Sequence, residues 1–175
     1  MKKNIEIILK PIGIVKSKIK ENNKSADKNK VSFSEKIDNI KTERKKIKEA
    51  IAEIIIEPDK IDLLDGIEDH SHIVILYWGH KISDKERKIK KVHPMGIKEL
   101  PKKGIFAVCS QARPNPILIT TVKLIEKNNN ILKVQGLEAF DKSPVIDIKP
   151  YSKSYHKAEA PKTPEWMETV YKKLN

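Results

Sequence analysis

Short apolar segments separated by polar turn residues dominate this chain. The segments are rich in β-branched residues, which favour strands. Strands at this spacing, joined by short turns, predict a sheet that closes on itself and so leaves no exposed edge. The expected fold class is all-β: a single closed β-barrel with a helical insertion after the first strand and a C-terminal helix. The predicted strands are residues 4–15, 54–57, 73–78, 105–109, 117–124, 131–137 and 144–148.

The helical insertion is predicted by a change of period. Ser32 and Glu35 match a capping box, in which each residue satisfies a backbone donor at the helix start. Isoleucines then follow at helical spacing with charged residues between them. We therefore expect a helix with lysine and glutamate facing solvent and these isoleucines against the barrel: Ile37, Ile40, Ile47 and Ile51.

A second helix is predicted at the C-terminus. Thr163 is a good N-cap, and Pro164 suits the first helical position. One face of this helix is apolar and is expected to pack on the barrel or on a second subunit; its residues are Trp166, Met167, Val170, Tyr171 and Leu174. The chain thus divides into a barrel domain, 5–160, with a variable lysine-rich insert, 16–52, and a C-terminal helix, 161–175.

Polar segments mark the turns and loops. Residues 16–30 contain so few large apolar side chains that we expect a mobile loop there. The asparagines at 128–130 predict a hairpin, because asparagine tolerates positive φ. Gly66 is expected to supply the unusual dihedrals of a turn. Residues 81–103 form a lysine-rich segment.

Composition restricts the class of protein. A chain of 175 residues is expected to form one domain. It contains no apolar run of membrane-spanning length and no apolar N-terminal signal, which predicts a cytoplasmic protein without membrane contact. Its single cysteine, Cys109, excludes an internal disulfide and gives no CxxC metal pattern.

The net charge of +12 predicts attraction to polyanions. Of 36 basic residues only Arg44, Arg87 and Arg113 are arginine, the usual reader of base edges. A lysine-rich surface suits attraction to a nucleic-acid backbone without sequence reading. The alternative is that lysine is simply the common surface residue of this protein.

Two proline-bearing segments carry the candidate chemistry. Residues 110–117 read Ser-Gln-Ala-Arg-Pro-Asn-Pro-Ile, and residues 141–151 read Asp-Lys-Ser-Pro-Val-Ile-Asp-Ile-Lys-Pro-Tyr. Arg113 and Asn115 each precede a proline, so both are restricted to extended backbone. A segment this stiff suits a pocket wall that must hold a guanidinium and a carboxamide still.

Together with Pro11–Ser17 and with Leu64–Ile73 leading into Tyr77–His80, these segments resemble the TsaA-like family. The family pattern is Arg-Ser-x-x-Arg-Pro-Asn-Pro-Ile-Gly, followed by Gly-Thr-Pro-Val-x-Asp-Ile-Lys-Pro-Tyr. The four blocks occur in family order. The resemblance implies a single β-barrel and an S-adenosylmethionine-dependent methyltransferase that acts on N6 of threonylcarbamoyl-modified adenosine in tRNA. It also implies a homodimer with the cofactor near the subunit boundary. No metal is expected, because His70 and His72 lie close together without a further ligand cluster.

The resemblance assigns candidate roles to residues of this chain. The candidate catalytic residues, which would orient the target nitrogen or stack on a base, are Asn115, Asp147, Lys149 and Tyr151. The candidate cofactor-binding residues are His80, Lys81, Cys109, Arg113, Ile119, Lys142, Ser143, Pro144 and Val145.

Simpler interpretations of these residues remain open. Asp147 and Lys149 share one face of an extended segment, so they could form only a structural ion pair. Arg113 could hold carbonyls of its own loop. His72 should face inward with Val74 and Leu76, as a hydrogen-bonded core histidine rather than a metal ligand.

The chain also departs from the family pattern. Cys109 stands in place of a cofactor-contacting arginine, Leu118 in place of a glycine, and Lys142 in place of another glycine. We hypothesise that Lys142 restores the charge lost at Cys109. The family's Pro-Arg-Gln-Pro-Gly-like turn, which belongs to the polar loop after the first strand, is missing as well. These departures leave two alternatives: a methyltransferase with another substrate, or a barrel that binds RNA or a ligand without catalysis.

Overall fold

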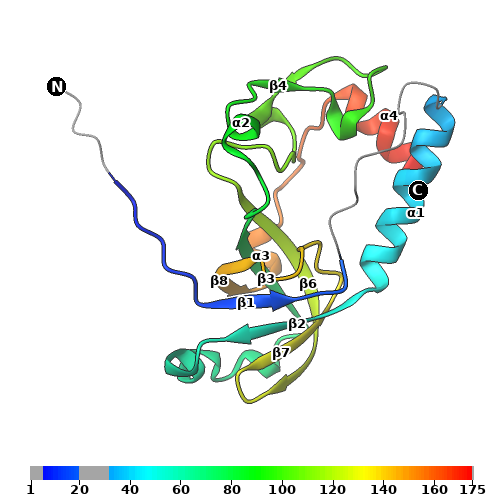
Figure 1. Ribbon diagram of the computed structural model, residues 1–175. Helices are drawn as coiled ribbons and strands as arrows, with labels where there is room; N and C mark the ends of the chain where they lie inside the picture. Colours follow the sequence, from blue (N-terminus) through cyan, green and yellow to red (C-terminus); the bar gives the residue numbers. More distant parts are fainter. Residues whose placement is uncertain (1–5, 20–31, 175) are drawn as a thin grey trace.

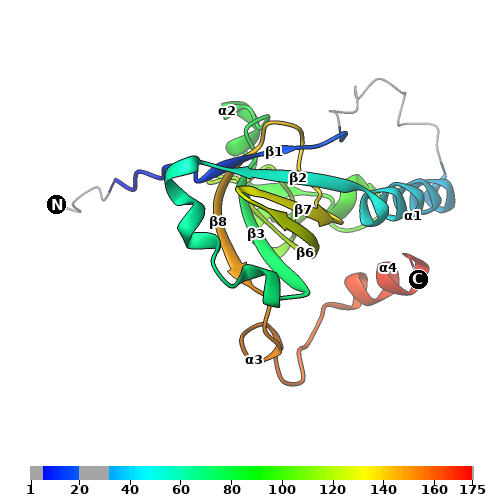
Figure 2. The same ribbon diagram turned by 90° about the horizontal axis from the view of Figure 1, so that it is seen from below.

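The computed structural model describes residues 6–19 and 32–174. Six antiparallel strands form a closed barrel in the order β1-β2-β7-β6-β3-β8, which confirms the predicted fold class. Figure 2 shows these strands surrounding a common interior. Their bounds are β1 Gly13–Lys16, β2 Ile51–Ile56, β3 His72–Trp78, β6 Ile117–Asn128, β7 Ile131–Gln135 and β8 Pro144–Pro150.

The barrel interior is filled by alternate residues of each strand. On β3 the interior residues are Ile73, Ile75 and Tyr77, each at most 4% exposed. Because side chains alternate between the two faces of a strand, His72 points the other way and is exposed. The prediction of an inward-facing His72 was therefore wrong: three large interior residues set the phase of β3. The His72 ring instead contacts the Ser71 hydroxyl, 2.9 Å from its Nδ1.

The first strand is shorter than predicted and closes the barrel. Residues 4 and 5 lie outside the described residues, and the strand begins only at Gly13. It pairs with β2 over four residues but with β8 over only two, Gly13 with Val145 and Ile14 with Pro144. Gly13 is needed there, because a Cβ at this position would lie 2.3 Å from the carbonyl oxygen of Ile55.

Helix α1, Phe33–Glu49, begins with the predicted capping box. The Ser32 hydroxyl accepts from the Glu35 N–H, and the Glu35 carboxylate accepts from the Ser32 N–H at 2.8 Å. The helix ends before Ile51, which begins β2 instead of extending the helical face. Of the predicted mobile loop, residues 20–30 lie outside the described residues.

The apolar face of α1 does not pack on the barrel as predicted. It packs on the C-terminal helix α4, Glu165–Leu174, in a second hydrophobic cluster (Figure 1). Helix α4 begins one residue later than predicted, with the Pro164 carbonyl accepting from the Met167 and Glu168 N–H groups. The buried residues of this second cluster are Ile37, Ile97, Leu100, Val170 and Leu174.

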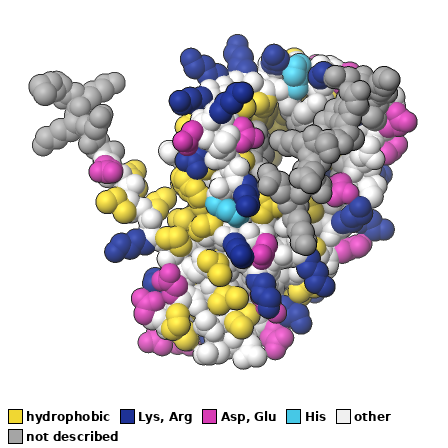
Figure 3. All heavy atoms as spheres, viewed as in Figure 1, with side chains coloured by type: hydrophobic (Ala, Val, Ile, Leu, Met, Phe, Trp, Pro, Cys, Tyr) yellow, Lys and Arg dark blue, Asp and Glu magenta, His cyan; other side chains and the backbone are white. Residues whose placement is uncertain are grey.

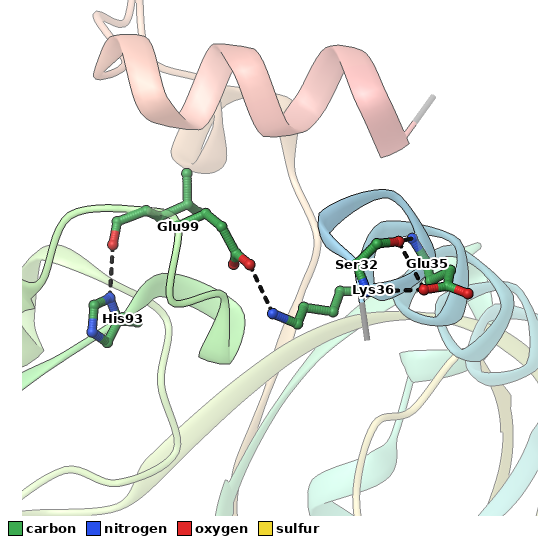
Figure 4. A network of polar contacts seen from close by, with 6 residues as sticks. Ser32, Glu35, Lys36, His93 and Glu99 are labelled. Atoms are coloured by element: carbon green, nitrogen blue, oxygen red, sulfur yellow. Dashed lines mark hydrogen bonds and ion pairs between the residues drawn. The ribbon is translucent and has the colours of Figure 1, made fainter. Parts of the chain in front are cut away.

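Polar contacts connect the loop that carries Ile97 to α1. The Lys36 ammonium lies 2.8 Å from the Glu99 carboxylate, and the His93 ring bonds the Leu100 carbonyl at 2.7 Å (Figure 4). The ion pair joins the loop to the helix, and the hydrogen bond connects two residues within the loop.

The lysine-rich segment folds into short elements, as seen at the top of Figure 1. The predicted strand at residues 105–109 was wrong. The two-residue strand Lys103–Gly104 ends before this range, and a 3-10 turn, Ile105–Ala107, follows it; Ile105 and, just after the turn, Val108 are buried without sheet pairing. The elements of this region are α2 Asp84–Arg87, β4 Lys91–Val92, a 3-10 turn Pro94–Gly96, β5 Lys103–Gly104 and a 3-10 turn Ile105–Ala107.

Both predicted turns are confirmed. Asn129 has φ 52° in the tight hairpin between β6 and β7, and Gly66 has φ 75°. The remaining elements are 3-10 helices Pro58–Leu64 and Ile67–Asp69 and helix α3 Lys153–His156. None of the helices in residues 6–19 and 32–174 has the length and apolar character needed to cross a bilayer.

Candidate functional site

One end of the barrel brings together residues from three strands. Tyr77 of β3 lies opposite Val145 of β8, and Trp78 lies opposite Ile117 of β6. The segments just outside these strands therefore meet at one barrel mouth. There the His80 ring lies 3.3 Å from the Ser143 hydroxyl, which is 2% exposed. This contact joins two candidate cofactor residues that are far apart in the sequence.

A small recess opens at this mouth. Its volume is about 10 Å³, enough for roughly one water molecule. Its lining residues include one lysine, one glutamate and three residues with an amide or hydroxyl group, together with apolar residues. The lining residues are Tyr77, Gly79, Lys81, Ile82, Gln111, Leu118, Glu138, Phe140 and Ser143.

The recess alters the acidity of two of its residues. Burial raises the pKa of the Tyr77 phenol to about 12, and the phenol donates to the Glu138 carbonyl at 3.2 Å. Desolvation also raises the pKa of the Glu138 carboxyl, an effect that the nearby Arg44 guanidinium opposes. Glu138 is thus a carboxylate in a poorly solvated position, where a bound cation would stabilise its charged form.

The other candidate cofactor-binding residues near Ser143, and Ile119 of β6, lie on different surfaces of the protein. Lys142 has φ 63°, donates its N–H to the Val15 carbonyl at 2.7 Å and is exposed. Val145 is buried in the barrel core, so only its backbone is available to a ligand. Pro144 pairs with Ile14 at the start of β8. Ile119 is 67% exposed on β6, opposite Leu76.

Cys109 is not among the residues of the recess. It lines a larger cavity of about 640 Å³, formed by α1, α4 and two loops. Gln111 lines both the cavity and the recess, so the two spaces are neighbours. The cavity is lined by Arg44, Val92, His93, Pro94, Met95, Gly96, Val108, Cys109, Ser110, Gln111, Trp166, Met167, Val170, Tyr171 and Leu174.

Arg113 and Asn115 lie on the loop before β6. The Arg113 guanidinium donates to the Val108 carbonyl at 2.9 Å and lies over the Phe106 ring. It therefore holds its own loop, as the simpler interpretation proposed. The Asn115 backbone carbonyl accepts from the Ile117 N–H, and the residue is exposed near the barrel mouth.

The candidate catalytic residues of β8 extend away from this mouth. Asp147 and Lys149 form an ion pair of 2.6 Å, with Asp147 opposite Leu76 and Lys149 opposite Val74. Tyr151 lies beyond the far end of the strand, where its N–H donates to the His72 carbonyl and its ring stacks on His156. At about 3.3 Å per residue, the length of β3 places Tyr151 about 20 Å from the mouth. One copy of the chain does not bring Tyr151 and Asn115 together.

Sequence reasoning missed several residues that line these spaces. Glu138 lies between the buried Leu137 and Ala139, and this position in an apolar segment was the one available signal. Gln111 lay within a quoted segment but received no role. Arg44 and Trp166 reach the cavity only through helix packing, which no local pattern specifies.

Comparison with known proteins gives a consistent family match. A model of the tRNA-methyltransferase O N-terminal domain matches residues 30–157. A probable S-adenosyl-L-methionine-binding protein of Methanothermobacter thermautotrophicus is 38% identical over 85% of this chain and 92% of its own length. An S-adenosyl-L-methionine-binding protein of Archaeoglobus fulgidus is 40% identical over 83% and 90%. The Escherichia coli tRNA (adenine(37)-N6)-methyltransferase is 36% identical over 60% of this chain and 47% of its own.

Solved structures support the fold. A crystal structure of TrmO from Pseudomonas aeruginosa superposes with a TM-score of 0.65 at 20% identity, over 95% of this chain. A second TrmO structure gives 0.64 at 23% identity over 91% of this chain. The chain spans 64% of each of these proteins.

Proposed function

The chain belongs to the tRNA-methyltransferase O N-terminal domain family, and from this membership we propose that it is an S-adenosylmethionine-dependent methyltransferase that acts on adenosine in tRNA. The finer proposal is that the acceptor is N6 of a threonylcarbamoyl-modified adenosine. The observation that supports cofactor binding most directly is the barrel-mouth recess, in which Lys81, Glu138 and Ser143 converge.

The charges of the recess suit S-adenosylmethionine. The cofactor carries a carboxylate, an ammonium and a sulfonium, and Lys81 and Glu138 offer one group of each sign. Ser143 and the His80 ring add hydrogen-bonding groups. Since the recess itself is water-sized, the cofactor would lie across its rim, with the Lys81 and Gln111 side chains displaced. When bound, it supplies an activated methyl group, because its sulfonium sulfur leaves as a neutral thioether.

The roles of the protein's own residues follow from this placement. Glu138 would balance the cationic end of the cofactor, and Lys81 would bind its carboxylate. Lys142 stays a candidate second cation beside Ser143. Positioning of this kind is the main aid that a protein can give to an in-line displacement.

We propose that a homodimer completes the site. Within one copy, Tyr151 and the Asp147–Lys149 pair extend along β8 away from the recess. The barrel also exposes an apolar outer face, and Figure 3 shows hydrophobic side chains side by side near β1 and β8. A partner covering this face would bring its own β8 close to the recess. The outer face consists of Ile14, Trp78, Ile117, Ile119 and Ile146.

The proposed tRNA partner is supported by the surface charge. Exposed lysines gather over α2 and β4, at the top of Figure 3. Such a patch attracts a phosphate backbone, and each neutralised phosphate makes affinity more dependent on salt. The lysines of this patch are Lys85, Lys88, Lys90 and Lys91.

Calorimetric titration with S-adenosylmethionine tests cofactor binding. We expect saturable heat that S-adenosylhomocysteine competes away. Lys81→Ala should weaken binding about tenfold, since it removes a charge-assisted bond. Lys85→Ala, an exposed lysine four residues away on α2, is the matched control and should leave the affinity unchanged. A wild-type protein that gives no heat would exclude the cofactor and the methyltransferase function.

Methyl transfer is tested separately. Purified protein, S-adenosylmethionine and tRNA carrying threonylcarbamoyladenosine should yield a methylated nucleoside by mass analysis. A product on another nucleoside would keep the enzyme class and change the substrate. The dimer is tested by light scattering: Ile119→Lys should yield monomers that bind cofactor but transfer no methyl group.

A further inference from the structure

The larger cavity is built partly by a segment outside the matched family domain. The family match ends at residue 157, whereas one wall of the cavity is α4, Glu165–Leu174. Its volume of about 640 Å³ is typical of pockets for small organic ligands. A function of this cavity would therefore depend on this chain's own C-terminal helix.

The cavity walls offer flat, polarisable surfaces. Trp166 and Tyr171 of α4 line one side, and Met95 lies on the Pro94–Gly96 loop. Aromatic rings stack on planar heterocycles, and methionine sulfur makes favourable contacts with ring edges. The walls thus suit a planar, partly apolar ring.

The loop that carries Met95 is held in an unfavourable conformation. Met95 has φ 52°, a left-handed value that non-glycine residues rarely adopt, and is 46% exposed. The loop is fixed by the His93–Leu100 hydrogen bond and the Lys36–Glu99 ion pair (Figure 4). A strained residue that the surroundings hold in place at a pocket rim is typical of a ligand contact.

The charged groups of the cavity favour an anion over a cation. Arg44 lines the cavity, and among its described lining residues there is no aspartate or glutamate. The Glu138 carboxylate interacts electrostatically with Arg44 but lines the neighbouring recess and not this cavity, so a sulfonium or ammonium has its carboxylate partner on the recess side. A neutral ring with a phosphate fits the cavity, because Arg44 can bind the phosphate and Gln111 can pair with a base edge.

We propose that the cavity binds a purine nucleotide, the acceptor base of the methyl transfer, with its ring against Trp166 and Met95 and its phosphate at Arg44. This inference rests on the proposed function, because the base is taken to be the acceptor. Gln111, which lines both spaces, separates the base from the cofactor recess and would place the acceptor nitrogen toward it.

Tryptophan fluorescence tests the proposal directly. The chain has two tryptophans, so Trp78→Phe leaves Trp166 as the single reporter. Titration of this variant with adenosine 5′-monophosphate should give saturable quenching. In the same background, Arg44→Ala should weaken binding about tenfold through the lost phosphate contact, and Met95→Ala should weaken it by a smaller factor. Lys172→Ala, an exposed lysine on the same helix, is the matched control and should have no effect.

Two results would overturn the proposal. One is the absence of quenching in a Trp78→Phe protein whose circular dichroism is that of a folded chain. The other is S-adenosylhomocysteine producing the same quenching and competing with the nucleotide, which would make the cavity the cofactor's adenine pocket. Calorimetry keeps the two proposals distinguishable. Cofactor heat without nucleotide quenching contradicts only this one. Quenching without cofactor heat contradicts the methyltransferase function, and with it the acceptor role of the base, but not nucleotide binding in the cavity.

Discussion

The barrel and the helical layer beside it both bury apolar side chains, but they enclose them differently. In the barrel, residues from six paired strands surround the core, so each interior side chain has neighbours on every side. In the helical layer, α1 and α4 meet along one seam with the loop that carries Ile97 and Leu100. The barrel therefore resists local opening, whereas the helical layer can loosen alone. This difference matters because the recess belongs to the barrel and the cavity to the layer.

The largest expected effect is on the barrel core. Ile75→Ala should lower the free energy of unfolding by about 4 kcal/mol, because the cavity it leaves is enclosed by paired strands. Urea unfolding, followed by far-UV circular dichroism, measures the loss. Ile55→Ala, at a half-buried β2 position, is the control and should lose much less. Equal losses would show that the interior is not the main source of stability.

The second effect concerns closure of the barrel. Gly13→Ala should cost about 3 kcal/mol, because the added Cβ would approach the Ile55 carbonyl and push β1 off β2. Gly104→Ala is the matched control, since a Cβ there meets nothing within 4 Å. Thermal melts of both variants compare them. A Gly13→Ala protein as stable as the control would mean that the barrel tolerates the separation of β1 from β2.

The helical layer should show a smaller and more local effect. Ile37→Ala removes a buried contact of α1 and should cost about 2 kcal/mol, because the seam can partly collapse. Hydrogen exchange should become faster in α1 and α4 while the barrel amides stay protected. The variant should keep cofactor affinity and lose nucleotide quenching at Trp166. Faster exchange throughout the barrel would contradict the separation of the two regions.

The start of α1 allows a still finer test. Ser32→Ala removes the capping hydroxyl and should cost about 1 kcal/mol. Ser34→Ala, two residues further along the same exposed helix, keeps the cap and should change stability little. Urea midpoints separate the two variants. A larger loss for Ser34→Ala would argue against the cap.

The smallest effect lies at the junction of the two regions. Because burial raises the pKa of Glu138, the folded protein holds this proton more tightly than the unfolded chain does. The stabilisation is present below the ordinary glutamate pKa and is lost as pH rises through the raised one. The Glu138→Gln variant should therefore be more stable than wild type at neutral pH, and the difference in their free energies of unfolding should shrink in acid. Arg44→Ala, which removes the charge that opposes the raised pKa, should enlarge this difference at neutral pH. Unfolding curves at several pH values check the sign. A gap that grows as the pH falls would show that the pKa is lowered.

The sequence predicts best those structural features that are determined by a few neighbouring residues. The capping box at Ser32, the turn at Asn129 and the strand predicted at residues 73–78 arise within a few residues, and the structure confirms them. Two predictions were wrong: that His72 faces inward, and that residues 105–109 form a strand. In both cases an apolar run does not say which side chains face inward, or whether a partner strand is present.

The candidate site shows the same limit. Sequence blocks led to His80 and Ser143, because each lies next to a strand whose position the barrel fixes. They did not lead to Arg44 or Trp166, which reach the cavity through helix packing between distant segments. Docking of an amphipathic helix depends on the shape of its partner, and a periodic pattern contains no information about that shape.

The two-residue pairing of β1 with β8 has a consequence for how the chain is made. Gly13 emerges from the ribosome well before its partner Val145, which is added about 130 residues later. At roughly 5–20 residues per second, the first strand waits on the order of ten seconds for this partner. We therefore expect the nascent barrel to remain an open sheet, with unpaired strand edges, until β8 is released.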